Sequence, residues 1–208
     1  MKLVWLYLRQ YKNLFDSSTM FQHCKKMKPI VFLDIDDVVA IDPNFSGSTV
    51  VAALKNNRNI EEKFWASVFL SSAVSNLSLM HEDFSPSYVI SSSWTNYLNR
   101  DQVAFAFNSA GLDFIAKNLH REWRTPKTEF IGRLIEIQTW VSKFGVTTQP
   151  ILIIDDFESG WNLVDSIFEQ NDQLVLCEPR LGFDKTKLDK AIQKLTAQIN
   201  GPPKKLRR

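Results

Sequence analysis

The sequence has little cysteine and no long apolar run, and each absence argues against a class of protein. Cys24 and Cys177 lie far apart and in no CxxC or Cys/His spacing, which argues against a disulfide scaffold and a zinc site. We therefore expect a reducing cytoplasm. The first apolar run, residues 3–8, is short for a secretory signal and far too short to cross a membrane.

The sequence also lacks an excess of charge of either sign. It has 25 Lys and Arg and 23 Asp and Glu among 208 residues, a net charge of +2. Four of the basic residues fall in the last five positions, so the remaining chain has 21 basic against 23 acidic residues. This balance excludes a globally basic nucleic-acid binder.

Neither an internal repeat nor a long Gly/Ser linker divides the chain. We expect one catalytic domain over residues 29–200, an N-terminal helical extension over 1–28 and a basic C-terminal tail over 201–208. A chain of this length buries roughly 70% of its unfolded surface, so it needs neither disulfides nor a structural metal to remain folded.

Short apolar runs alternate with stretches of helical periodicity, which predicts an α/β fold with a central parallel sheet. Strands are predicted at 30–33, 88–90, 151–154 and 174–177. Helices are predicted at 61–80, 100–110, 126–143, 159–170 and 184–199. The helix over 126–143 has the clearest signals, with Thr125 as a good N-cap and Pro126 at the first helical position.

The segment VFLDIDDVV is an apolar strand that ends in Asp34, Asp36 and Asp37. Side chains alternate along a strand, so Asp34 and Asp36 project to the same side, at the edge where open parallel sheets bind ligands. Adjacent carboxylates repel each other unless a divalent cation compensates them. The alternative is that these residues only end a strand and cap the next turn.

The segment ILIIDDFESG repeats this design, with four apolar residues that lead into Asp155 and Asp156. Two parallel strands that both end in paired aspartates would bring four carboxylates to one sheet edge. A folded protein rarely tolerates that charge density without Mg²⁺ or a similar ion. The two pairs together favour a metal site over a simple strand end.

Two weaker signals lie between the acidic pairs. The strand in SYVISSSW runs into Ser91, Ser92 and Ser93, where a hydroxyl could donate to a phosphoryl oxygen or the three residues could simply form a polar turn. Lys127 in TPKTEF falls in the first turn of a predicted helix, where a lysine is unfavourable unless it shares the helix N-terminus with an anion. An ordinary surface lysine is the alternative.

The order of these motifs resembles the haloacid dehalogenase (HAD) superfamily of phosphohydrolases. Its members have an hhhhDxD strand, a strand ending in Ser or Thr, a Lys, and a strand ending in an acidic pair. The resemblance implies a three-layer Rossmann-like fold with a minimal cap, and a hydrolase that forms an aspartyl phosphate. It makes Asp34 the nucleophile and Asp36 the general acid and base.

The same resemblance implies the binding residues. Ser91, with Ser92 as the fallback, would bind the phosphoryl group together with Lys127. Asp155 and Asp156 would hold Mg²⁺, completed by the Asp34 carboxylate and the main-chain carbonyl of Asp36.

The spacing leaves little room for a lid over the site. Ser91 and Lys127 are 36 positions apart, enough for one helix and a strand at 111–115, and residues 42–60 form only a small insert. An uncapped site favours a bulky phosphorylated substrate, such as a polynucleotide end or a protein, because the substrate itself must exclude water.

Aromatic and basic residues near these motifs are compatible with a polynucleotide substrate. SSSWT is similar to the SxW pattern of HAD domains associated with RNA-repair proteins. Trp94 in this pattern could stack on a base or pack in the core. Arg121, Trp123 and Arg124 could form a basic, aromatic rim for a phosphodiester backbone or lie in a solvated loop.

These features favour a Mg²⁺-dependent phosphatase that hydrolyses a phosphomonoester, with nucleic-acid ends slightly ahead of proteins and small molecules. A non-catalytic binding module that keeps the fold and the metal site is one alternative. A phosphotransferase, in which an alcohol takes the place of water, is the other.

Overall fold

The computed structural model describes residues 28–40, 52–53, 62–127, 132–144 and 149–201. Five strands in these segments form one sheet, and every neighbouring pair is parallel. The strands are β1 (Ile30–Leu33), β2 (Ser87–Ile90), β3 (Leu119–Arg124), β4 (Ile151–Asp156) and β5 (Leu174–Cys177). Their order across the sheet is β3-β2-β1-β4-β5, so β1 lies in the middle.

The register of the sheet aligns the last residues of β1 and β2 with a residue near the end of β4. Leu33, the last residue of β1, pairs with Ile90 of β2 and with Ile154 of β4. The residues that follow these three positions therefore meet at one edge of the sheet, the edge at which open α/β sheets bind ligands.

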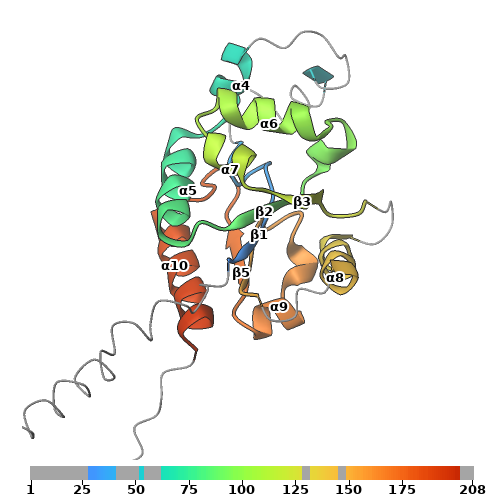
Figure 1. Cartoon of the computed structure of the whole chain (residues 1–208), viewed down its shortest axis with the longest axis vertical. Coiled ribbons are helices and arrows are strands. Elements are labelled where there is room, and N and C mark those ends of the chain that lie inside the picture. The colour runs from blue at the N-terminus through green and yellow to red at the C-terminus, as the bar shows by residue number, and fades with distance from the viewer. Residues whose placement is uncertain (1–27, 41–51, 54–61, 128–131, 145–148, 202–208) are drawn as a thin grey trace, which may run out of the picture.

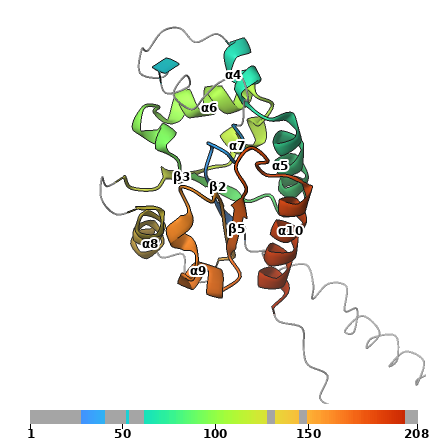
Figure 2. The ribbon, with the colours of Figure 1, turned by 180° about the vertical axis from the view of Figure 1, so that it is seen from behind.

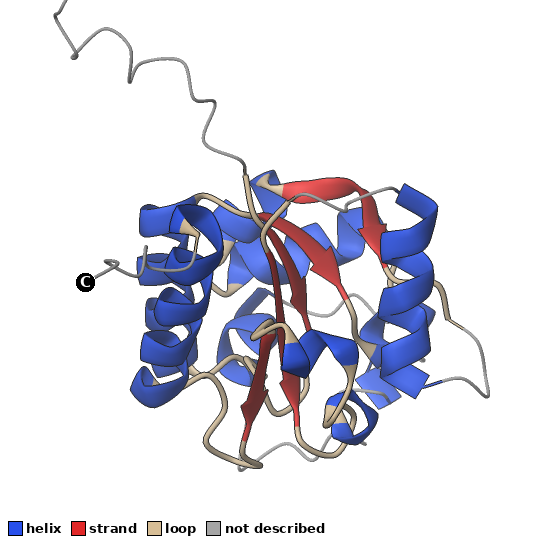
Figure 3. Ribbon diagram, turned by 90° about the horizontal axis from the view of Figure 1, so that it is seen from below, coloured by secondary structure: helices blue, strands red, loops and turns tan. Residues whose placement is uncertain are grey.

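Helices cover both faces of the sheet and give the molecule three layers (Figure 3). One face carries α5 (Ser71–Phe84) and α10 (Lys185–Asn200), and the other carries α8 (Gly132–Phe144) and α9 (Ile167–Gln170), as Figures 1 and 2 show from opposite sides. Side chains of β1 alternate between two apolar clusters: Val31 and Leu33 pack toward α5 and α10, and Ile30 and Phe32 toward α8 and α9. Because both faces are covered, β1 and β4 are buried along their whole length.

The structure confirms the predicted α/β fold with a central parallel sheet, and the four predicted strands correspond to β1, β2, β4 and β5. Two helices also agree closely with the prediction. The helix α6 (Arg100–Ser109) begins with a capping box between Asn99 and Gln102. The helix α10 begins after Asp184, whose side chain accepts the backbone N–H of Lys187.

The single helix predicted over 61–80 is wrong, because the structure has α4 (Glu62–Val68) and α5 in its place. The break comes at Phe69 and Leu70, whose backbone joins the loop after β1. Phe69 forms an isolated β-bridge with Ala40, and the N–H of Leu70 donates to the carbonyl of Val39 at 2.8 Å. These pairings to a distant segment replace helical hydrogen bonds.

Two further predictions fail because local backbone geometry intervenes. The helix predicted over 159–170 is divided into η3 (Trp161–Leu163) and α9, and Asp165 between them has a left-handed φ of 59°. The strand predicted at 111–115 is instead the start of α7 (Asp113–Lys117). The edge strand β3 follows it and was not predicted, because only Leu119 of its six residues is buried.

The helix predicted over 126–143 is present only in part. Residues 125–127 are not helical, and α8 begins at Gly132, whose φ of 68° is accessible to glycine. Thr125 is therefore not the N-cap of α8. Its N–H donates to the carbonyl of Ile90 at 3.1 Å, which continues the pairing next to β2.

Three predicted segments lie almost wholly outside the described residues. They are the N-terminal extension 1–28 apart from Lys28, the insert 42–60 apart from residues 52–53, and the basic tail 201–208 apart from Gly201. Among the helices of the described segments, none has the length and apolar character that a membrane crossing requires.

Candidate active site

Asp34 directly follows β1 and lies at the centre of the sheet edge. Its N–H donates to the carbonyl of Ile154 at 2.9 Å, so the backbone is still held to β4 at this residue. Asp34 is buried, and the next side chain, Ile35, is buried in the core. At Asp37 the backbone adopts a φ of 52°, which turns the chain. The central strand thus holds the Asp34 carboxyl at the sheet edge.

Asp155 and Asp156 are the last two residues of β4, and both are buried. The Asp155 Oδ1 accepts the N–H of Asp156 at 3.0 Å. The Asp156 Oδ1 accepts the N–H groups of Glu158 at 2.6 Å and Ser159 at 2.9 Å. A carboxylate that accepts from two residues further on closes a tight turn, so the loop after β4 is folded onto Asp156.

Asp34, Asp155 and Asp156 together form what we call the acidic cluster. One oxygen from each carboxylate lies within 4.8 Å of the others. The Oδ2 atom of each is buried without a hydrogen-bond partner in the described residues. Buried carboxylate oxygens without hydrogen bonds are unfavourable, and a divalent cation that prefers oxygen ligands would compensate them. The donor set therefore fits a metal such as Mg²⁺.

Arg133 of α8 supplies positive charge to the acidic cluster and was not predicted. Its Nη2 lies 3.0 Å from Asp34 Oδ1, and its Nε lies 2.7 Å from Asp155 Oδ2. The second contact is an ion pair by distance only, because its geometry does not make a hydrogen bond. Burial alone would lower the pKa of Arg133, but Asp34 and Asp155 raise it above its usual value. The guanidinium therefore stays charged.

One signal in the sequence could have identified Arg133. It precedes Ile137 and Trp140 by four and seven positions, and both of these residues are buried in the apolar cluster under α8. A charged residue in phase with the buried face of a helix needs a buried partner. The sequence alone does not say which partner that is.

Glu136 connects Lys127 to the acidic cluster. Its Oε2 lies 3.1 Å from Lys127 Nζ and 3.3 Å from Arg133 Nη1. The hydroxyl of Thr125 also donates to this oxygen, at 3.4 Å. Burial lowers the pKa of Lys127, Arg133 lowers it further, and Glu136 opposes both effects. The structure thus brings Lys127 near the acidic cluster through Glu136.

The two predicted serines differ in their surroundings. Ser91 follows β2, its N–H donates to the carbonyl of Leu33 at 2.9 Å, and its Oγ accepts from Arg133 Nη1 at 3.3 Å. Ser92 is also buried, but its Oγ accepts the N–H of Trp94 at 3.4 Å and so caps the short turn η2 (Ser93–Asn96). Ser91 belongs to the network around the acidic cluster, whereas the hydroxyl contact of Ser92 is local.

Asp36 is not a member of the acidic cluster, and its carboxyl is held by η2. The indole N–H of Trp94 donates to Asp36 Oδ1 at 2.9 Å, and the hydroxyl of Ser93 donates to Oδ2 at 3.2 Å. Burial raises the pKa of Asp36, and these two hydrogen bonds oppose the rise. A carboxyl with a raised pKa keeps its proton over a wider pH range, as a general acid requires.

Burial also raises the pKa of two members of the acidic cluster. It raises the pKa of Asp34 well above its usual value despite the opposing Arg133. It raises the pKa of Asp155 to about 7, again against Arg133 and with help from the charge of Asp156. A cation that binds here must therefore compete with protons.

The other residues singled out in the sequence lie near η2 and on β3. Trp94 is buried in an aromatic group with Trp65 and Phe69, so it packs in the core and does not present its face to a base. Arg124 lies on β3, donates to the carbonyl of Thr95 at 2.8 Å, and stacks at 5.5 Å from the ring centre of Trp123. Arg121 is exposed on the same strand.

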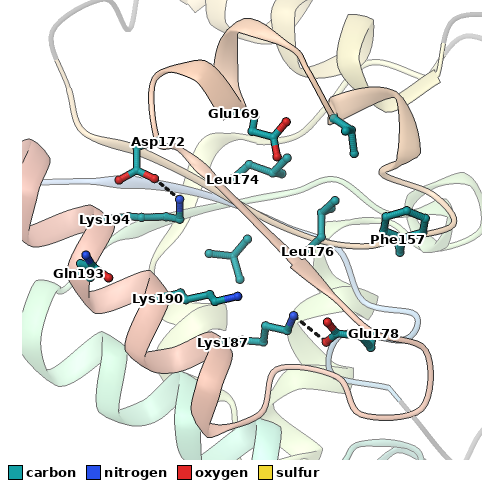
Figure 4. A pocket seen from close by; sticks show the side chains of 12 residues that line it. Phe157, Glu169, Asp172, Leu174, Leu176, Glu178, Lys187, Lys190, Gln193 and Lys194 are labelled. Atoms are coloured by element: carbon teal, nitrogen blue, oxygen red, sulfur yellow. Dashed lines mark hydrogen bonds and ion pairs between the residues drawn. The ribbon is translucent and has the colours of Figure 1, made fainter.

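A separate hollow with a volume of about 580 Å³ lies between α10 and the edge strand β5 (Figure 4). Lys187 pairs across it with Glu178 at 2.6 Å, and Lys194 pairs with Asp172. No member of the acidic cluster lines this hollow, so it is not part of the candidate site.

The comparisons with known proteins agree with the motifs. A family model described as the HAD domain in Swiss Army Knife RNA repair proteins matches residues 30–188. The match runs from β1 into the first turn of α10 and contains the acidic cluster, Ser91, Lys127 and Arg133. No curated protein and no solved structure matches the chain. The resemblance predicted from the four motifs is confirmed: the chain belongs to the family of HAD domains in Swiss Army Knife RNA repair proteins.

Proposed function

We propose that this chain is a Mg²⁺-dependent phosphatase that hydrolyses a phosphomonoester through an aspartyl phosphate. The observation that carries the proposal is the acidic cluster, whose three buried Oδ2 atoms make no hydrogen bond within the described residues, although Asp155 Oδ2 forms an ion pair with Arg133. The family of the chain supports phosphohydrolase chemistry at this place. Oxygen ligands for a hard cation and donors for a phosphoryl group are combined at one sheet edge.

In the proposed reaction, an oxygen of Asp34 attacks phosphorus while the bond from phosphorus to the leaving oxygen breaks. Asp36 gives its proton to that leaving oxygen. Asp36 then takes a proton from a water molecule, which attacks the phosphorus, releases inorganic phosphate and restores Asp34. Two easier steps replace one difficult displacement.

The phosphoryl oxygens need neutralising charge before an anionic nucleophile can approach them. Ser91 would donate a hydrogen bond, with Ser92 as the fallback, while Lys127 and Arg133 supply positive charge. Arg133 already contacts both Asp34 and Ser91 within 3.3 Å, which supports adding it to the residues named by the motifs.

The metal would be held by Asp155 and Asp156, with Asp156 as the direct ligand of choice, together with the Asp34 carboxylate and the carbonyl of Asp36. When bound, it would act as a Lewis acid on the phosphoryl group. The unpartnered Oδ2 of Asp156 supports this assignment, because its Oδ1 is already occupied by two backbone N–H groups.

We propose a polynucleotide end, RNA in particular, as the substrate, ahead of proteins and small molecules. The family occurs in RNA repair proteins, and the exposed Arg121 lies on the edge strand β3 beside the Arg124 and Trp123 stack. Cys177 is a buried free thiol, which fits the cytoplasm as the working compartment.

The first prediction concerns the nucleophile. Purified protein with Mg²⁺ should release phosphate from p-nitrophenyl phosphate and from 3′- or 5′-phosphorylated RNA oligonucleotides. Asp34→Asn should lower turnover by at least about 10³-fold, because an amide cannot form the covalent intermediate. Circular dichroism checks that the fold is kept.

The control is Asp37→Asn, which changes a nearby carboxylate that does not belong to the acidic cluster, and it should keep most activity. If Asp34→Asn retains turnover, the nucleophile is assigned wrongly. If the unaltered protein releases no phosphate and does not trap beryllium fluoride at Asp34, a non-catalytic binding module is favoured. Transfer to an added alcohol would identify a phosphotransferase.

A further inference from the structure

We infer that the turn η2 positions the proton of Asp36, and that Trp94 is the residue that decides which carboxyl oxygen carries it. Trp94 is thus a positioning residue that acts through Asp36. The inference rests on the proposed function, because the proton concerned is the one that Asp36 gives to the leaving oxygen.

The geometry places one donor on each oxygen of Asp36. Trp94 Nε1 lies 2.9 Å from Oδ1, and Ser93 Oγ lies 3.2 Å from Oδ2. Both donors are neighbours in η2, which follows β2, whereas Asp36 follows β1. A single turn therefore holds both oxygens of a carboxyl that belongs to the adjacent strand.

The two donors differ in what they can do when Asp36 is protonated. An indole N–H can only donate, so Oδ1 of Asp36 must remain an acceptor. The oxygen of a carboxylic acid that carries the proton is a poor acceptor, so a proton on Oδ1 would weaken this hydrogen bond. A serine hydroxyl can donate or accept, so Ser93 can accept from a proton on Oδ2 as readily as it donates to the bare oxygen. The proton therefore belongs on Oδ2.

Packing fixes the direction of the Trp94 N–H. The indole is 1% exposed, with its ring centre 5.5 Å from that of Trp65 and 5.9 Å from that of Phe69. The backbone N–H of Trp94 is bound to Ser92 Oγ, which anchors the start of the turn. A buried ring with two side-chain torsions has few ways to reorient in such surroundings.

A comparison within the molecule separates this contact from ordinary core packing. Trp140 is equally buried, and its indole N–H donates to a backbone carbonyl, that of Glu122, at 2.9 Å. The N–H of Trp94 is instead directed at Asp36, whose side chain is partly exposed. A buried indole N–H can therefore donate to a backbone carbonyl, and it does not need a carboxyl at the candidate site as its acceptor.

The test uses two substrates that differ in their need for a proton. A p-nitrophenolate leaves without protonation, whereas the alkoxide of an alkyl phosphate such as glycerol 2-phosphate needs one. Trp94→Phe keeps an aromatic ring but removes the N–H. It should lower kcat/KM for glycerol 2-phosphate by about 10- to 100-fold, and that for p-nitrophenyl phosphate by less than about threefold.

Trp65→Phe is the matched control, since it shrinks a neighbouring ring in the same aromatic group. It should change both kcat/KM values by the same small factor. Ser93→Ala is a second variant at an exposed position, so it should fold even where Trp94→Phe does not. It should show the same selective loss to a smaller degree.

A solution measurement tests the hydrogen bond without turnover. In a ¹⁵N–¹H spectrum, the indole signal that Trp94→Phe removes should move when Asp36→Asn is introduced, while the signal of Trp140 should not. An unmoved Trp94 signal would overturn the contact.

Failure of this inference is distinguishable from failure of the proposed function. A protein that hydrolyses neither substrate overturns both. A protein that hydrolyses both substrates, with equal losses or no loss in Trp94→Phe and Ser93→Ala, overturns the positioning by η2 alone.

Discussion

Arg133 links the stability of the domain to the candidate site. Its guanidinium lies between Asp34 and Asp155, and all three side chains are at most 7% exposed. Charges at this depth are costly unless each has a partner, so the removal of one leaves the others uncompensated. In the metal-free protein this arginine is therefore a structural residue as well as a proposed phosphate ligand.

We predict that Arg133→Gln lowers the free energy of unfolding of the metal-free protein by about 3–5 kcal/mol, because it leaves buried carboxylates unpaired. Mg²⁺ should restore part of this loss, since a cation that binds only the folded state stabilises it. Urea unfolding with EDTA and with Mg²⁺ measures both effects.

Arg121→Gln is the control, because it removes an exposed arginine from β3. It should change the free energy of unfolding by less than about 0.5 kcal/mol. An equal and small effect of both substitutions would mean that the acidic cluster does not depend on Arg133.

The ends of β1 and β4 make the stability of the domain depend on pH. Burial holds the pKa of Asp155 at about 7 in the folded metal-free chain, against about 3.9 for an unfolded aspartate. A carboxyl whose pKa is raised by folding contributes fully below the unfolded value, and its contribution is lost as the pH rises through the folded value. Asp34 shifts in the same direction.

We predict that the metal-free protein loses stability as the pH rises from about 4 to about 7, and that Asp155→Asn flattens this dependence. The difference in the free energy of unfolding between the two proteins, measured by urea unfolding in EDTA between about pH 5 and about pH 8, isolates the contribution of Asp155. Parallel curves would contradict the prediction. Apparent Mg²⁺ affinity should rise over the same interval, because the cation displaces protons.

The sequence predicted the central strands better than the helices, for a physical reason. The strands β1 and β4 are buried on both faces, so they appear as continuous apolar runs. The break between α4 and α5 depends on pairing of Phe69 and Leu70 with residues about 30 positions earlier, which no local pattern encodes. The edge strand β3 was missed because exposed polar residues dominate it.

The candidate site could likewise be predicted from the sequence only in part. Asp34, Asp155 and Asp156 lie at the ends of predictable strands, so their convergence follows from parallel topology. The contacts of Arg133 with Asp34 and of Trp94 with Asp36 join residues 99 and 58 positions apart. Only the packed fold brings such pairs together. The sequence alone therefore did not decide whether Trp94 packs in the core or stacks on a base.

Exposed apolar side chains are unevenly distributed over the domain. Of the nine large apolar side chains that are exposed among the described residues, five fall between residues 157 and 181, after the acidic pair of β4. Trp161 is the most exposed, at 67%. Its neighbour Gly160 lies so close to Asp155 and Asp156 that a Cβ there would come within 2.7 Å of the Asp156 carbonyl oxygen. The backbone of Trp161 therefore begins one residue after a close approach to the end of β4.

If the substrate is an RNA end, Trp161 offers a surface for base stacking. We predict that Trp161→Ala raises KM for a phosphorylated RNA oligonucleotide by about 5- to 150-fold, which corresponds to about 1–3 kcal/mol for one stacked base. KM for p-nitrophenyl phosphate should not change. Steady-state kinetics on both substrates measure the effect.

Phe105→Ala removes an exposed aromatic side chain from α6 and is the control, expected to leave both KM values as they are. An equal change for the oligonucleotide and the small substrate would exclude base stacking at Trp161. A strong preference for phosphopeptides over oligonucleotides would exclude RNA as the substrate.

The positive and negative side chains around Asp34 do not balance one another in number. With every group ionised, the acidic cluster and Glu136 carry four negative charges, and Arg133 and Lys127 carry two positive ones. One divalent ion makes this set electroneutral, and a second would leave it with an excess of positive charge. The chain's own side chains would thus favour one divalent ion per domain, and under the proposed function an incoming phosphate dianion would meet a neutral site.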